Sequence, residues 1–250
     1  MSTSRSPSEG ERPLRGQFTT THWSVVVEAG QHDSPTAAQA LEQLCKKYWY
    51  PLYVYVRRKG YSVHEAEDLT QEFFAKLLTK KYLTVADRNR GKFRSFLLGS
   101  LEHFLAREWN RSHAQKRGGG WILVSPDGLK PEDRYRLEGT DALTPERIFD
   151  RRWAMTVLEQ AMNRLREECA TEGKADLFER VRDCLSGERA EVSYSQLASD
   201  VGMSEGALKV TVHRLRRRFG ELIRAEITQT VTTEQEKEEE LQHLLAVLRS

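Results

Sequence analysis

The sequence predicts an all-α protein with two small helical domains joined by a flexible linker, the second of them a helix-turn-helix. Apolar residues recur at helical spacing in several long segments, whereas no alternating pattern typical of strands extends beyond a few residues. Three consecutive glycines at 118–120, followed by an acidic stretch containing Pro and Gly, divide the helical segments into two groups. A chain of 250 residues is long enough for two such domains.

Composition and patterning set the boundaries of five parts. The opening segment is rich in Ser, Pro, Gly and charge, which is typical of a disordered tail. The predicted parts are the N-terminal tail 1–16, the first helical domain 17–117, the linker 118–143, the helix-turn-helix domain 144–226 and a C-terminal amphipathic helix extension 227–250.

The first domain contains three segments with helical periodicity. The first spans 37–61 and includes Pro51, which is expected to kink or restart the helix because proline lacks the backbone donor. Ser62 and Glu65 then form a capping box that starts a second helix. The third pattern covers 91–117.

The second helix of this domain carries a mixed acidic and apolar strip. Such a strip is suitable for docking on another protein, and it is equally typical of a surface that a third helix buries. The apolar face consists of Ala66, Leu69, Phe73 and Leu77. The candidate docking residues are Asp68, Gln71, Glu72 and, beside them, Phe74.

Aromatic and basic residues are interleaved along the third helix. Aromatic rings can stack on unpaired bases while guanidinium groups hold phosphates, so this pattern fits contact with a single strand. A core stripe of Phe93, Leu97, Leu101 and Phe104 fits the same segment, and the pattern leaves both interpretations open.

The second domain begins at Thr144, a predicted N-cap, with Pro145 at the first helical position. Further along, a short helix ends at Gly202, and Ser204 caps the next helix. This helix-turn-helix would bury Leu197, Ala198 and Val201 against Leu208, Val212 and Leu215. The opposite face is basic and lacks bulky side chains, which suits a major groove better than it suits an ordinary solvated helical hairpin.

Charge is segregated along the chain although the net charge is only +2. Residues 87–117 carry a net +5 and residues 205–224 a net +4, whereas 118–150 and 226–250 are acidic. Because local charge governs phosphate affinity, two basic blocks indicate two contacts with one polyanion.

Several functional classes are disfavoured. The three cysteines, Cys45, Cys169 and Cys184, have no metal-ligand spacing and are expected to be reduced, partly buried thiols, so we expect no metal or cofactor. No clustered catalytic residues occur, which disfavours a DNA-processing enzyme, and we expect no enzymatic activity. The chain lacks the apolar core of a signal peptide and any apolar run near the ~20 residues of a membrane span, so the expected location is the cytoplasm, without membrane insertion.

The order of these parts resembles the extracytoplasmic-function (ECF) sigma factors. The resemblance covers roughly residues 38–225 and rests on AEDLTQEFFAKLL, then FRSFLLGSLEHFLAREWNR, a linker, and ASDVGMSEGALKVTVHRLRRR. It implies a protein that binds core RNA polymerase, directs it to promoter DNA and has an anti-sigma factor as a further candidate partner.

The resemblance also implies roles for individual residues. The strip at Asp68, Gln71, Glu72 and Phe74 falls where the family docks on core polymerase. Contacts to the −10 element and to its melted single strand fall on Arg94, His103, Arg107, Trp109, Asn110 and Arg111. Contacts to the duplex −35 element fall on Ser204, Glu205, Gly206, Lys209, Val210, His213, Arg214 and Arg217. The chain departs from the family at His103 and Arg107, where Asn and Asp are common.

The alternative is a stand-alone helix-turn-helix regulator that acts without polymerase and needs a dimer and a palindromic site. The C-terminal extension is open to two interpretations as well. Its leucines, Leu241, Leu244, Leu245 and Leu248, could pack on the bundle, or its acidic helix could dock near Arg216–Arg218 and compete with DNA phosphate.

Overall fold

The computed structural model describes residues 35–78, 92–112, 132–133, 135, 143–185, 193–231 and 233–249. Every regular element within these ranges is helical, which confirms the predicted all-α class. The predicted tail 1–16, most of the linker and the start of the first domain lie outside the described residues.

The first group of helices consists of α2 (Pro35–Arg58), α3 (Val63–Leu78) and α5 (Phe93–Ser112). α2 runs through Pro51 as one helix, without the second start that the sequence allowed. Between α2 and α3, Gly60 has a φ of 96°, a backbone conformation that favours glycine. The predicted capping box is present: the Ser62 amide donates to the Glu65 carboxylate over 2.9 Å, and the Glu65 amide donates to the Ser62 hydroxyl over 3.4 Å.

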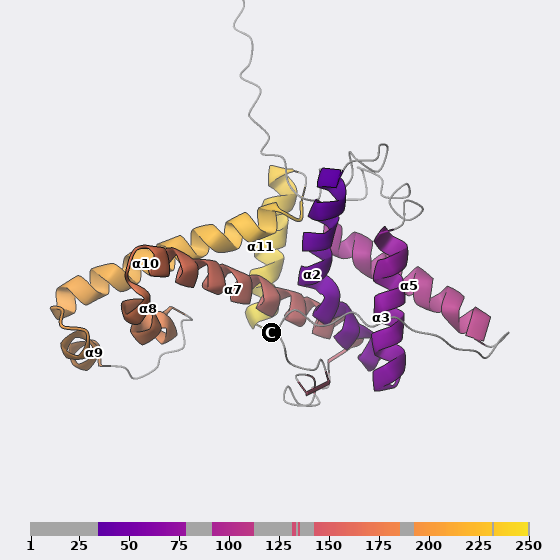
Figure 1. Cartoon of the computed structure of the whole chain (residues 1–250), viewed down its shortest axis with the longest axis horizontal. Coiled ribbons are helices and arrows are strands. Elements are labelled where there is room, and N and C mark those ends of the chain that lie inside the picture. Colours follow the sequence, from indigo (N-terminus) through magenta and orange to yellow (C-terminus); the bar gives the residue numbers. More distant parts are fainter. Residues whose placement is uncertain are drawn as a thin grey trace, which may run out of the picture.

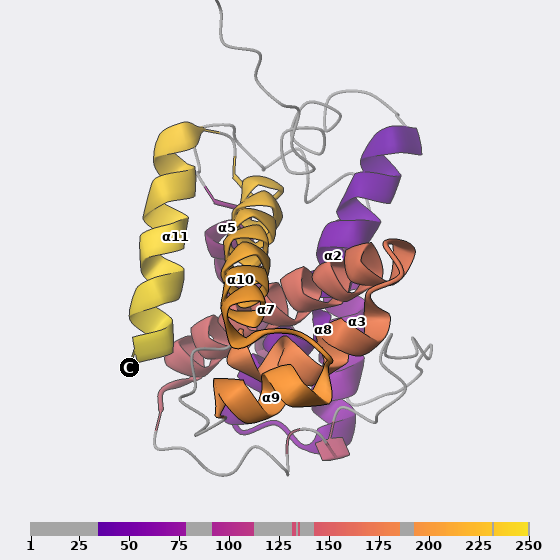
Figure 2. The ribbon, with the colours of Figure 1, turned by 90° about the vertical axis from the view of Figure 1, so that its left-hand side faces the viewer.

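The second group begins with α7 (Pro145–Thr171), whose predicted N-cap Thr144 accepts from the Arg147 amide. It continues through α8 (Ala175–Val181), a 3-10 turn (Arg182–Cys184), α9 (Tyr194–Asp200), α10 (Glu205–Thr228) and α11 (Glu234–Arg249). α11 lies beside α10 and α7 (Figure 2). α11 also begins with a capping box, since Thr233 and Glu236 exchange two hydrogen bonds of 3.1 Å.

The buried side chains form two clusters, and two long helices take part in both. α7 contributes Trp153 to the cluster around α2, α3 and α5, and Leu165 to the cluster around α8 and α9. α10 contributes Leu208 to the second cluster and Ile227 to the first. α9 and α5 therefore lie toward opposite ends of the molecule, with α7 and α10 between them (Figure 1). The division into domains 17–117 and 144–226 stays a prediction.

A buried carboxylate ties the end of α10 to both groups. Glu226 forms an ion pair with Lys47 of α2 and accepts a hydrogen bond from Arg164 of α7 over 3.0 Å. Burial raises the pKa of Glu226, but the two cations lower it by a larger amount, so the pKa lies below the usual value for glutamate. This ion-pair cluster fixes the position at which α10 joins the first group.

One residue of the predicted linker is attached to α2. The Glu132 carboxylate accepts two hydrogen bonds of 3.0 Å from the Arg57 guanidinium and one of 2.7 Å from the Tyr53 hydroxyl. The chain between α5 and α7 is thus anchored at this residue.

All three cysteines are buried and unpaired with one another, in agreement with the expectation of reduced thiols. Burial raises the pKa of the Cys45 thiol to about 12, so this side chain is neutral at physiological pH.

Candidate nucleic-acid interface

The α9–α10 unit consists of two helices joined by a tight turn. Gly202 lies in the left-handed region with a φ of 68°, and the Met203 amide donates to the Ala198 carbonyl over 2.9 Å. Ser204 then caps α10, because its hydroxyl accepts from the Ala207 amide over 3.2 Å. The turn residues that the sequence singled out therefore take the positions expected of them.

One face of this unit is packed. Leu197 and Ala198 of α9 are buried in the same cluster as Leu208 and Val212 of α10. Val201, Leu215 and Phe219 are partly buried against that cluster. Ala198 is 3 % exposed, and a larger side chain there would have to displace its neighbours.

The opposite face of α10 is open to solvent. Val210 is 51 % exposed although it is apolar, and the other residues assigned to duplex contact are polar, charged or glycine. All eight residues assigned to duplex contact are exposed, and we call them the α10 face: Ser204, Glu205, Gly206, Lys209, Val210, His213, Arg214 and Arg217.

The basic residues of α10 fall into two kinds. Arg216 donates two hydrogen bonds to the Cys184 carbonyl, and Arg218 pairs with Glu168 over 2.7 Å. These two side chains thus fasten α10 to neighbouring elements. By contrast, Arg217 lies on the α10 face with a loose 3.5 Å contact to Glu221, and Arg214 has no charged partner within the described part of the chain.

Most of the aromatic residues of α5 belong to the core. Phe93, Phe96 and Phe104 are buried with Leu97 and Leu101, which favours the core-stripe interpretation for this side of the helix. The C-terminal half of α5 has a different exposed side, which we call the α5 face. It consists of His103, Arg107, Asn110 and Arg111. Trp109 is also exposed, but it lies on another side of the helix, because residues two positions apart do not share a helix face.

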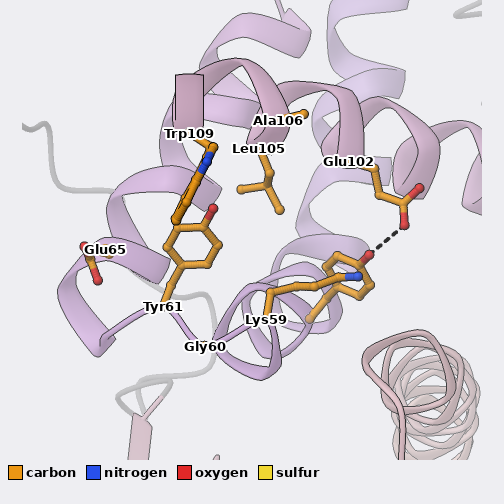
Figure 3. Close-up of a pocket in the computed structure, with 9 residues that line it drawn as sticks. Lys59, Gly60, Tyr61, Glu65, Glu102, Leu105, Ala106 and Trp109 are labelled. Carbon is orange, nitrogen blue, oxygen red and sulfur yellow. Dashed lines mark hydrogen bonds between the residues drawn. The ribbon is translucent and has the colours of Figure 1, made fainter. Parts of the chain in front are cut away.

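Trp109 stands beside a pocket of about 570 Å³ between α5 and the α2–α3 turn (Figure 3). Trp109 is 57 % exposed, and its indole lies next to the Tyr61 ring with Leu105 beside them in the pocket wall. On the far side, the Tyr55 hydroxyl donates to Glu102 over 2.7 Å, and burial together with this carboxylate raises the pKa of Tyr55. The exposed indole can stack on a flat, unpaired base, whereas Arg107 and Arg111, two positions away, point to another side of the helix.

Arg94 does not share the α5 face. Its guanidinium lies beneath α11, where it donates to Glu240 over 2.9 Å and pairs with Asp150 of α7. Lys92, one residue before α5, pairs with Glu239 over 3.1 Å. Of the two interpretations of the extension, the packing of its leucines on the bundle is the one that the structure shows, through buried Leu244 and partly buried Leu241. Its carboxylates pair with Lys92 and Arg94, a contact that neither interpretation predicted.

The candidate docking strip on α3 is divided by burial. Asp68 is exposed, Gln71 and Glu72 are half-buried, and Glu72 pairs with Lys76 over 2.8 Å. Phe74 is 3 % exposed and packs against Phe73, so its ring belongs to the core and is not available on the surface.

Comparison of the chain with protein-family models, with curated proteins and with solved structures finds no match. None of the described helices is long and apolar enough to cross a membrane. The described residues also contain no group of three or more His, Cys, Asp or Glu side chains that could hold a metal ion.

Proposed function

We propose that the chain is a sigma factor that binds core RNA polymerase and directs it to promoters. The observation that carries the proposal is the α10 face. A helix capped by Ser204 is packed on one side and exposes eight residues on the other. Among them is Arg214, for which the described residues provide no charged partner. This is the form in which a recognition helix enters a major groove.

The two ends of the molecule would have different tasks. The α10 face would contact the duplex −35 element. The arginines of the α5 face would hold the phosphates of the melted −10 strand, and exposed Trp109, on another side of α5, would stack on a base. Two weak contacts on one chain reinforce one another because the second becomes intramolecular once the first has formed. The separation of α9 and α5 along the molecule supports this division (Figure 1).

Polymerase docking is proposed for the exposed part of α3, where Asp68 projects to solvent and Glu72 lies beside it. The polymerase would supply the catalytic chemistry, so the chain itself would carry out no reaction and would act in the cytoplasm. An anti-sigma factor is a candidate partner of the same surfaces.

Gel filtration with purified core polymerase tests the proposal. The chain is expected to elute with core, and the complex is expected to retain a promoter fragment that core alone does not retain. A chain that binds palindromic duplex DNA as a dimer and never elutes with core would instead be a stand-alone regulator.

A further inference from the structure

The N-terminal end of α5 has the composition of an anion site. Lys92 precedes the helix and Arg94 lies in its first turn, so two cations flank the positive end of the helix dipole. The Phe93 amide donates to the Thr230 carbonyl over 3.1 Å and is thus satisfied within the chain, so the two cations are the groups available to an anion. Backbone amides and cations at a helix start are the groups that bind phosphate in proteins.

This end of α5 already holds anionic groups, and they come from α11. Glu240 is 0 % exposed, with Oε1 2.9 Å from Arg94 Nε and Oε2 3.6 Å from Lys92 Nζ. Glu239 places Oε2 3.1 Å from Lys92 Nζ. From these contacts we propose that the start of α5 is a phosphate site for promoter DNA, which the carboxylates of α11 close within the same chain.

A contribution to stability is not by itself a sufficient reason for burying the ion pair of Glu240 and Arg94. Burying Glu240 and Arg94 removes both charges from water, and such a pair is often no more stabilising than apolar side chains of similar size. If α11 leaves, Glu240 regains its hydration, and DNA phosphate can take its place on the cations. The exchange replaces one anion by another and leaves no unpaired charge.

α11 is also weakly held by apolar contacts. Leu244 is buried, and Leu241 and Val247 pack partly against the core, whereas Leu245 and Leu248 remain exposed. A helix of 16 residues is marginal in isolation, so α11 depends on its leucine face and its carboxylates for attachment to the rest of the molecule. Much of its attachment is therefore electrostatic and open to competition.

Release of α11 changes the sign of the local charge. With α11 in place, Lys92 and Arg94 face three carboxylates, those of Asp150, Glu239 and Glu240. With α11 removed, the same two cations face Asp150 alone. The surface at the start of α5 would thus turn from acidic to basic, which is the change that admits a DNA strand.

The inference rests on the proposed contact between α5 and the melted strand, but its test does not require polymerase. The affinity for a fluorescent single-stranded oligonucleotide is measured for the full chain and for Glu239→Gln/Glu240→Gln. Glu238→Gln with Glu234→Gln is the matched control, because these exposed carboxylates lie on the same helix and the structure pairs neither with α5.

The closed site predicts about tenfold tighter binding for the double variant at low salt, and no gain for the control pair. When the logarithm of the association constant is plotted against the logarithm of the salt concentration, the double variant should show a steeper slope. The difference should be about 0.7 for each phosphate that the two freed cations contact. Adding Arg94→Ala to the double variant should abolish the gain. Equal affinities for the double variant and the control would overturn the proposal.

Hydrogen exchange on the unaltered chain tests the same competition without a substitution, so it remains valid if a variant folds poorly. Addition of the oligonucleotide should accelerate amide exchange in α11 while it protects α5. Continued protection of α11 in the oligonucleotide complex would contradict the competition. A gain in oligonucleotide affinity without any polymerase binding would leave the phosphate site standing and reject the sigma-factor function alone.

Discussion

Arg216 donates two hydrogen bonds, of 2.9 Å and 2.6 Å, to the backbone carbonyl of Cys184, 32 residues earlier in the chain. This contact joins α10 to the 3-10 turn that follows α8. The neighbouring Arg217 lies on the α10 face instead. Adjacent arginines in one basic run therefore have a structural role and a proposed recognition role.

The difference predicts that Arg216→Ala destabilises the fold. Removal of a charged donor from a partly buried carbonyl should lower the free energy of unfolding by about 1 kcal/mol. Arg217→Ala, which removes only a loose surface contact, should change it by less than about 0.5 kcal/mol. Chemical denaturation of the two variants measures both values, and equal losses would show that Arg216 does not fasten α10.

Arg214→Ala and Arg217→Ala should each weaken promoter binding. A guanidinium paired with a guanine edge contributes about 1–3 kcal/mol, and its loss should relax the preference at one base pair. A phosphate contact would weaken all sequences equally. Arg224→Ala is the matched control, since Arg224 is an exposed arginine on the same helix outside the α10 face. Binding unchanged in both variants would reject the assignment of the α10 face.

Exchange of Asp68 and Glu72 for Lys should abolish binding to core polymerase while the helical circular dichroism stays intact. Lys76 would lose its pair with Glu72 but keep Glu108 at 2.8 Å, so α3 should remain folded. Glu167→Lys with Asp176→Lys makes the same charge change on exposed residues of the second group. Loss of core binding in this control would point to net charge, and normal binding by the α3 variant would exclude α3 as the docking surface.

Acid should destabilise the junction of α10 with α2. The pKa of Glu226 lies below the ordinary glutamate value of 4.5, because Lys47 and Arg164 outweigh the effect of burial. A carboxyl with a lowered folded-state pKa stabilises the fold above its unfolded pKa, and this contribution is lost as the pH falls through the folded value. The free energy of unfolding should therefore decline as the pH drops below about 4.5.

Glu226→Gln tests that attribution, because it removes the titrating group and keeps the shape. Its unfolding free energy at neutral pH should be lower by about 3 kcal/mol, the low end of the range for breaking a buried ion pair. The variant should also show a weaker acid dependence than the unaltered chain. An identical decline in both proteins would assign the acid sensitivity to other carboxyls.

The local features of the fold could be predicted from the sequence. The capping residues Ser62, Thr144 and Ser204 have the expected partners, because a cap depends on residues three positions away. The packed and exposed sides of α10 followed from its 3.6-residue period for the same reason.

Long-range pairing could not be predicted in this way. Glu240 and Arg94 are 146 residues apart, and neither periodicity nor charge blocks indicate which cation an acidic helix will meet. The run of basic residues likewise did not indicate that Arg216 binds a backbone carbonyl of the fold while Arg217 is exposed. Phe74 lies beside the apolar face of α3, and only tertiary packing decides that its ring is buried as well.

Run-off transcription with purified core polymerase tests the proposed function most directly. Core is incubated with the chain and a library of genomic promoter fragments, and the transcripts are compared with those of core alone. We expect transcripts of defined length that require the chain, disappear with Arg214→Ala/Arg217→Ala and persist with Arg224→Ala. Transcription that is the same with and without the chain, across the whole library, would contradict the sigma-factor function.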